Sequence, residues 1–304
     1  MLDASHAKFA SSRGQFARLI DENHPAITFQ LLDLKDFGLS DDLYIKMNAR
    51  GKPLTPFETF KARYEEKLKS QLNGAMFSLA GHPFSAADYV AQRMDTAWAD
   101  LFWKLRDPKS HQFDQAFMNL ACTIALVTRN PDDEGYLDDV SKLRSTREGE
   151  VPSYTDFHSR GWFDDRFTLT IIHLLDSWSS ESGTLSCFLP DNTLFDERIF
   201  FNKIALSRES LTYAEIVQFA GYVAFIDKYH NSIDTAAFQE WMRIIYDLST
   251  NTIYNRVEDF RRSIRGLNVL TLVLTLASVK NIACYNTFVK SNPTSPLTLI
   301  AYFS

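Results

Sequence analysis

Residues 48–58 read Asn48-Ala49-Arg50-Gly51-Lys52-Pro53-Leu54-Thr55-Pro56-Phe57-Glu58, and this stretch predicts a turn between two helices. The first helix starts after Ser40, a good N-cap, and stops at Gly51, because glycine adopts the left-handed conformation at low cost. The second starts at Thr55, with proline at the first helical position and glutamate three residues on. The stretch therefore predicts a helix–turn–helix joint with Arg50, Gly51 and Lys52 at its apex.

The pattern on either side of this joint predicts the fold class. Upstream, residues 5–22 fit a helix, and the β-branched, apolar run Ile27–Leu34 predicts the one clear strand. Downstream, Ser85 caps a helix that continues to Leu105. Further helices are predicted over residues 113–127, 163–180, 195–207, 212–230, 234–249 and 253–279. The prediction is a mainly α protein: a multi-helical body, residues 76–304, with a small α/β N-terminal remnant, residues 1–75.

Composition limits the classes of function. The chain has 304 residues, of which 45% are hydrophobic, so it can bury a substantial core. Its formal net charge is -6, which excludes a general electrostatic attraction to nucleic acid and leaves only a local patch. The histidines show no metal-ligand spacing, and the three cysteines, Cys122, Cys187 and Cys284, are predicted to be reduced thiols. No metal site is predicted.

The sequence predicts a cytoplasmic protein with no membrane contact. Its N-terminal residues lack the apolar core of a secretory signal. The longest apolar run, Leu267–Val279, is interrupted by polar residues and is shorter than the roughly 20 residues that a bilayer needs. We therefore interpret this run as a core helix.

Four stretches, spread over roughly residues 40–265, resemble the central part of the GmrSD-type phage-defence proteins. The most specific is residues 42–55, followed by Phe57–Ala62, which is similar to the Asn-x-Arg-Gly-x-x-Leu-Thr element of that family. The other three are helical packing patterns: residues 94–103 with 113–117, Leu211–Tyr213 with the helix that follows, and residues 241–245 with 251–259.

The resemblance implies a nucleotide-dependent nuclease that acts on modified DNA. Family members carry an Asp-Gly-Gln-Gln-Arg loop in a ParB/sulfiredoxin-like front domain, and many carry a C-terminal His-Asn-His nuclease domain; this sequence contains neither. We expect a family member shortened at both ends, with no catalytic residues of its own. By resemblance, the implied cofactors are a nucleoside triphosphate and a divalent cation, and the implied partners are DNA and a protein that supplies the missing loop.

The predicted phosphate- or nucleic-acid-binding residues are Asn48, Arg50, Gly51, Lys52 and Thr55. Two cations flank a glycine whose backbone allows close approach, and backbone amides at a helix start favour anions. Lys61 and Arg63 extend this patch, whereas Glu65 and Glu66 dilute it. The alternative is that these residues only end one helix and begin the next.

Other conspicuous residues are assigned structural roles. Arg256, Arg261, Arg262 and Arg265 form a second basic cluster, but Glu258 lies at ion-pair spacing, so a salt-bridged face is favoured. The acidic pairs Asp132/Asp133 and Asp164/Asp165 fit helix starts better than metal sites. His173 is predicted to be a core histidine. The aromatic residues predicted to lie in the core are Trp98, Phe102, Trp103, Tyr213, Phe219, Tyr222, Phe225 and Tyr229.

Three functional hypotheses follow. The leading one is a GmrSD-like defence component that contacts nucleotide or DNA phosphate at Arg50–Lys52. The second is a non-enzymatic interaction module, in which an open strand edge at Ile27–Leu34 docks to a partner that carries the catalytic loop. The third is a non-functional fragment of a larger nuclease.

Overall fold

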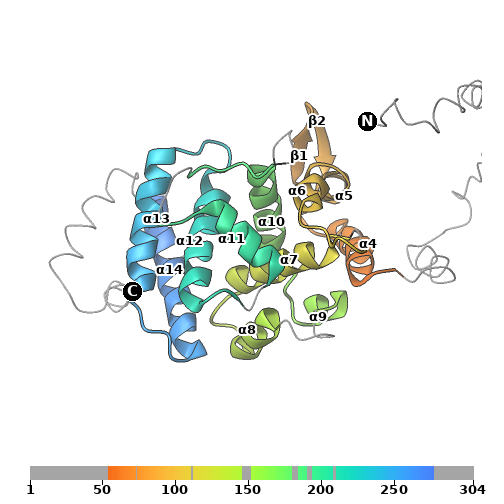
Figure 1. The fold of residues 1–304 in the computed structure, drawn as a ribbon. Helices are drawn as coiled ribbons and strands as arrows, with labels where there is room; N and C mark the ends of the chain where they lie inside the picture. The colour runs from red at the N-terminus through yellow and green to blue at the C-terminus, as the bar shows by residue number, and fades with distance from the viewer. Residues whose placement is uncertain are drawn as a thin grey trace, which may run out of the picture. The chain divides into compact units, whose positions relative to one another are not determined.

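The computed structural model describes residues 54–276, apart from residues 73, 111, 146–151, 180–183, 190–193 and 208–209, with side chains as far as Thr271. All of these residues belong to one compact unit that begins at Asn48. This part of the chain is mainly α-helical, as predicted (Figure 1). The elements are α4 (Pro56–Leu68), β1 (Met76–Leu79), β2 (His82–Ser85), α5 (Ala86–Met94), α6 (Ala97–Trp103), α7 (Asp114–Thr128), α8 (Tyr136–Arg144), α9 (Tyr154–Ser159), α10 (Asp165–Trp178), α11 (Glu197–Leu206), α12 (Tyr213–Tyr229), α13 (Thr235–Thr250) and α14 (Val257–Leu276).

Helix α4 starts where the sequence predicts. The Thr55 hydroxyl accepts a hydrogen bond from the Glu58 amide (3.1 Å), and the Glu58 carboxylate accepts one from the Thr55 amide (2.7 Å). This capping box satisfies two amides that the helix leaves without intrahelical partners. The predicted strand Ile27–Leu34 and the predicted helices over residues 5–22 and 41–50 lie outside the described residues.

Helix α7 lies at the centre of the core. Every residue from Ala116 to Thr128 is buried, as expected for a helix that is apolar on all sides. It packs against α4, α8, α10, α11 and α12. Helices α12, α13 and α14 lie side by side next to this centre (Figure 1). The whole assembly shares one hydrophobic core, to which α4 contributes Phe57, Phe60, Tyr64 and Leu68.

A β-hairpin precedes α5, and the sequence did not predict it. Strands β1 and β2 pair antiparallel, with Phe77 opposite Phe84. Ala80 (φ 50°) and Gly81 (φ 81°) make the two-residue turn, which needs positive φ at both positions. The Phe77 ring packs on Tyr89 of α5 with 5.2 Å between centroids. Three partly buried side chains of the hairpin, Phe77, Leu79 and Phe84, pack against the core.

Two further differences from the prediction concern helix boundaries. The helix predicted from Ser85 to Leu105 is two helices, because the chain breaks at Asp95-Thr96, where Thr96 has a non-helical backbone (φ -127°, ψ -111°). Helices α8 and α9 were not predicted. The predicted helices over 113–127, 163–180, 195–207, 212–230 and 234–249 are confirmed within about two residues, and α14 occupies most of 253–279.

Helix α14 contains residues 267–276 of the apolar run that the sequence assigns to the core, and its Leu267 and Leu270 are buried. No helix within the described ranges is both long enough and apolar enough to span a lipid bilayer.

Candidate nucleic-acid interface

Of the predicted phosphate-binding residues, the structure describes Thr55. Asn48, Arg50, Gly51 and Lys52 lie outside the described residues, so their role stays a prediction. Thr55 is the N-cap of α4 and uses its hydroxyl and its amide in the capping box. Pro56 has no N–H, and the Glu58 carboxylate brings negative charge to the helix start. The start of α4 by itself therefore offers an anion little.

A pocket of about 260 Å³ adjoins the start of α4. Three segments contribute to its walls: the first residues of α4, the loop between α6 and α7, and the first turns of α7. The lining residues are Thr55, Pro56, Phe57, Asp107, Ser110, Gln112, Asp114, Gln115 and Met118. Asp107 accepts hydrogen bonds from the amides of Lys109 (2.9 Å) and Ser110 (2.7 Å), which shapes the loop. With two carboxylates and two amides in its walls, the pocket suits a hydrogen-bond donor better than an anion.

The next two cations along the chain, Lys61 and Arg63 on α4, contact other side chains of the protein. Lys61 forms an ion pair with Asp95 and lies 3.9 Å from the Glu65 carboxylate. The guanidinium of Arg63 lies over the Tyr154 ring, 5.8 Å from its centroid. These two side chains therefore add little free positive charge to the start of α4.

Three of the four arginines in the second basic cluster form ion pairs, as predicted. Arg261 lies 3.6 Å from Glu258 and donates a hydrogen bond to the Pro131 carbonyl oxygen (2.6 Å). Arg265 pairs with Asp132 (2.6 Å), so these two arginines join α14 to the loop before α8. The partner of Arg262 differs from the prediction: it is Asp259 (3.3 Å), since Asp259 rather than Glu258 faces it across one helical turn.

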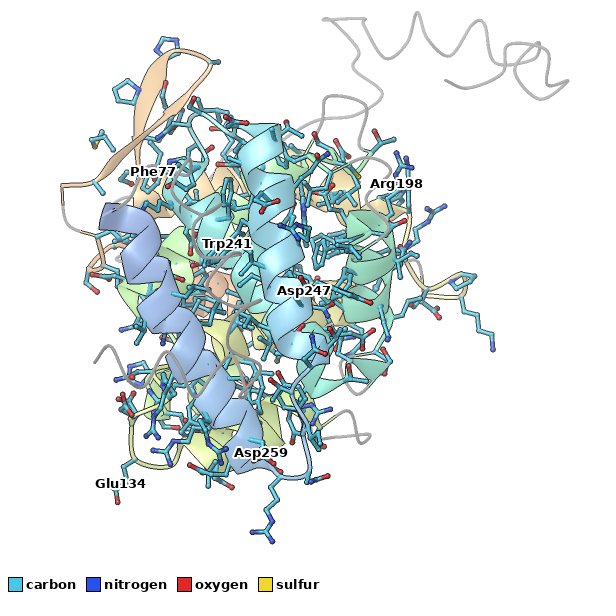
Figure 2. The ribbon with its side chains drawn as sticks, turned by 90° about the vertical axis from the view of Figure 1, so that its left-hand side faces the viewer. Phe77, Glu134, Arg198, Trp241, Asp247 and Asp259 are labelled. Carbon is cyan, nitrogen blue, oxygen red and sulfur yellow. The ribbon has the colours of Figure 1, made fainter. Side chains whose placement is uncertain are left out.

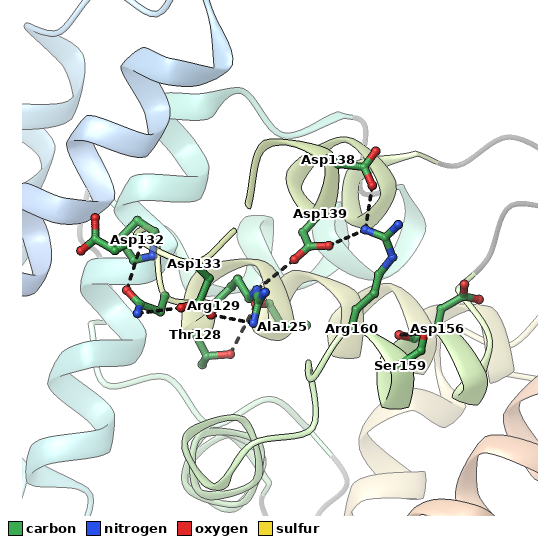
Figure 3. A network of polar contacts seen from close by, with 12 residues as sticks. Ala125, Thr128, Arg129, Asp132, Asp133, Asp138, Asp139, Asp156, Ser159 and Arg160 are labelled. Carbon is green, nitrogen blue, oxygen red and sulfur yellow. Dashed lines mark hydrogen bonds and ion pairs between the residues drawn. The ribbon is translucent and has the colours of Figure 1, made fainter. Parts of the chain in front are cut away.

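A buried carboxylate organises the polar network of Figure 3. The Asp139 side chain, on α8, is 4% exposed and binds Arg129 (2.9 Å) at the end of α7 and Arg160 (2.6 Å) after α9. Arg129 also pairs with Asp133, and Arg160 with Asp138. Asp132 and Asp133 therefore bind arginines, while Asp164 caps α10 as predicted. In the parts of the chain that the structure describes, no group of His, Cys, Asp or Glu side chains has the arrangement of a metal site.

His173 is not a core histidine, which corrects the prediction. Its imidazole is 15% exposed, and its Nδ1 lies 3.1 Å from the Asp227 carboxylate, which also accepts a hydrogen bond from Thr170 (2.5 Å). The His230 ring stacks on it, 3.8 Å between centroids, and donates from Nδ1 to the Asp227 carbonyl oxygen. Burial, and then the neighbouring His173, lower the pKa of His230. Sequence reasoning missed this cluster because its two halves, on α10 and at the end of α12, lie more than fifty residues apart.

Most of the predicted core aromatics are buried, including Trp98, Phe102, Phe219, Tyr222 and Phe225. Tyr213 and Tyr229 are partly buried against the core. Trp103 is the exception, because 48% of it is exposed at the end of α6. Cys122 is buried and Cys187 is partly buried, and both are free thiols, as predicted; Cys284 lies outside the described residues.

The chain was compared with protein-family models, with curated proteins and with solved structures, and nothing matched in any of the three. The resemblance to GmrSD-type proteins therefore rests on the quoted sequence elements alone. Of the most specific element, residues 54–55 and the Phe57–Ala62 segment fall within the described part of the chain and lie at the start of α4, and the other three elements are described as well.

Proposed function

We propose that this chain is a component of a GmrSD-like defence system and contacts the phosphate of a nucleotide or of DNA through Asn48, Arg50, Gly51 and Lys52. The observation that carries the proposal is the start of α4. The Asn-x-Arg-Gly-x-x-Leu-Thr element predicts a helix beginning after Thr55, and α4 begins at Pro56 with both bonds of the capping box in place. The two cations of the element thus precede a well-defined helix by only a few residues.

The attachment of α4 to the core supports a positioning role. Phe60 and Tyr64 are fully buried, and the Tyr64 hydroxyl forms a 2.8 Å hydrogen bond with Thr168 of α10. Phe57 packs on Phe117 of α7 with 4.9 Å between centroids. A helix held in this way keeps its first residue fixed, which reduces the entropy lost when a ligand binds nearby.

The proposal assigns no catalytic step to this chain. The loop and the nuclease domain to which the family owes its chemistry have no counterpart in the sequence. The role is to bind phosphate and to present it to groups supplied by another protein.

Two binding assays on the full chain test the proposal, one with a fluorescent nucleoside triphosphate and one with a labelled DNA duplex. Arg50→Ala/Lys52→Ala should weaken binding of at least one ligand by about tenfold or more, because phosphate contacts by cations supply most of the affinity. Lys67→Ala/Lys69→Ala is the matched control, because it removes the same charge at the other end of α4. Equal binding by the wild type and the Arg50/Lys52 variant, with unchanged thermal unfolding, would overturn the proposal.

A further inference from the structure

The loop between α6 and α7 carries an exposed aromatic side chain. Trp103 ends α6 and is 48% exposed, while its neighbours Trp98 and Phe102 are buried. Among the large hydrophobic side chains that are exposed in the described residues, Trp103 is the only aromatic one. The exposed part of the indole is an aromatic surface that a ligand can contact.

Arg106 holds this indole in place. Its guanidinium carbon lies 4.7 Å from the centroid of the Trp103 ring, and its Nη1 donates a hydrogen bond to the Trp103 carbonyl oxygen (2.8 Å). The cation covers part of the ring, and the remaining surface of the ring faces solvent. The side chain is therefore ordered before any ligand arrives, which lowers the cost of stacking on it.

Three cations of this loop find no acidic partner among the residues that the structure describes. Within the described part of the chain, no carboxylate lies within ion-pair distance of Lys104, Arg106 or Lys109, whereas Lys61, Lys203 and Arg265 each pair with one. The acid within the loop, Asp107, accepts hydrogen bonds from the backbone amides of Lys109 and Ser110. The loop thus keeps a local positive charge on a chain whose net charge is -6.

The loop is firmly anchored and projects from the helices, as seen at the right-hand edge of Figure 2. The Asp107 amide donates to the Gln112 carbonyl oxygen (2.9 Å) across its base. Phe102 and Phe113, at its two ends, stack with 6.2 Å between centroids. Ser110 and Gln112 line the same pocket as Thr55, so the loop borders the start of α4.

We infer that the Trp103–Ser110 loop is a binding surface for single-stranded nucleic acid, in which a base stacks on Trp103 and Lys104, Arg106 and Lys109 contact the phosphates. An ordered aromatic ring among unpaired cations is the combination by which proteins hold single strands without sequence preference. A duplex hides the faces of its bases, so it can use the cations but not the indole. The inference names a second surface and does not depend on residues 48–52.

Fluorescence anisotropy of a labelled oligothymidine with the full chain tests the inference. Trp103→Leu should weaken binding about tenfold or more, and Trp103→Phe should keep most of the affinity, because phenylalanine still stacks. Lys104→Ala/Lys109→Ala should reduce the slope of log affinity against log salt concentration by about 0.7 for each lost phosphate contact. Lys67→Ala/Lys69→Ala serves again as the charge-matched control.

The outcomes separate this inference from the proposed function. Unchanged oligothymidine binding by Trp103→Leu overturns the inference, whatever Arg50→Ala/Lys52→Ala does. A loss that appears equally in Trp103→Leu and Trp103→Phe also contradicts stacking. Binding of polyglutamate as tight as that of the oligonucleotide, lost only with the lysines, would assign the loop to an acidic protein partner instead. If the loop variants fail to bind the oligothymidine and Arg50→Ala/Lys52→Ala binds it normally, the inference is supported, and the proposed function is decided separately by the nucleotide and duplex assays.

Discussion

Gly221 shows how closely α12 and α13 pack. A Cβ atom at this position would lie 2.8 Å from Cγ2 and 2.9 Å from Cγ1 of Ile245. The Trp241 indole, labelled in Figure 2, donates a hydrogen bond to the Gly221 carbonyl oxygen (2.8 Å) and holds the two helices at this distance. We predict that Gly221→Ala lowers the free energy of unfolding by about 1–3 kcal/mol in urea titrations, because overpacking outweighs the helix propensity of alanine.

Ile245→Ala provides the control for this prediction, since it removes the two atoms that the new Cβ would meet. Gly221→Ala should therefore cost less in the Ile245→Ala background than in the wild type. Strictly additive effects of the two substitutions would show that the contact does not limit the packing of the helices.

Glu197 is a buried acid whose hydrogen bonds are satisfied. It is 2% exposed and accepts hydrogen bonds from the Leu189 amide (2.9 Å), the Phe188 amide (3.1 Å) and the Tyr222 hydroxyl. We predict that Glu197→Ala lowers the free energy of unfolding by about 3 kcal/mol, because it leaves buried donors without acceptors. The exposed Glu134, labelled in Figure 2, gives the matched control Glu134→Ala, which should change stability little. Equal effects of the two substitutions would contradict the role of Glu197.

At the scale of single residues, the sequence could identify the cap Thr55 but not the exposure of Trp103. Trp98 and Phe102 are four residues apart and share one helical face, whereas Trp103 lies about 100° further round. In a helix that ends at residue 103, this position faces outward. The aromatic pattern therefore predicted that this segment contributes to the core, but it did not predict that Trp103, at the end of the helix, would be exposed.

At the scale of elements, caps and breakers made the helices predictable. Threonine or serine followed three residues later by an acid starts α4 and α5, and proline separates α6 from α7 and α7 from α8. The hairpin was missed because its turn is Ala80-Gly81, a weaker signal than Asn-Gly, and its strands are four residues long. Helices α8 and α9 are short, which makes their periodic pattern weak, although Ser153 and Asp156 form a capping box at the start of α9. The ion pairs of Asp139 with Arg129 and Arg160 join residues that lie apart in the sequence, so the sequence gives no sign of them.

The histidine pair between α10 and α12 predicts a pH dependence of stability. The pKa of His230 is lower in the folded state than its usual value of about 6.5, so the unfolded state binds more protons in this range. Neutral His230 contributes fully to the stability of the folded state above about pH 7. This contribution is lost as the pH falls toward the pKa that His230 has in the folded state. We predict that the free energy of unfolding, measured by urea titration at successive pH values, decreases as the pH is lowered below about 7.

His230→Phe should flatten this dependence, because phenylalanine keeps an aromatic ring on His173 but takes up no proton. His82→Phe, on the exposed hairpin, is the control and should titrate like the wild type. If the free energy of unfolding changes equally with pH in His230→Phe and in the wild type, His230 is not the source of the pH dependence.

At the scale of the whole molecule, charge decides what the protein can bind. The net charge is -6. Most of the arginines on or next to helices α8, α9 and α14 form ion pairs with carboxylates. Binding to nucleic acid must therefore come from few cations, and it must be sensitive to salt. The sequence pointed to residues 48–52 through their pattern, but it gave no signal for the Trp103 loop, because pairing between distant residues determines which cations stay free.

The salt dependence of duplex binding tests the central proposal, contact between phosphate and the Arg50–Lys52 turn, most directly. The affinity of the full chain for a labelled duplex is measured over a series of salt concentrations, for the wild type and for Arg50→Ala/Lys52→Ala. Each lost phosphate contact should reduce the slope of log affinity against log salt by about 0.9, so the double variant should lose about 1.8. Identical slopes and affinities for the two proteins would contradict the proposal.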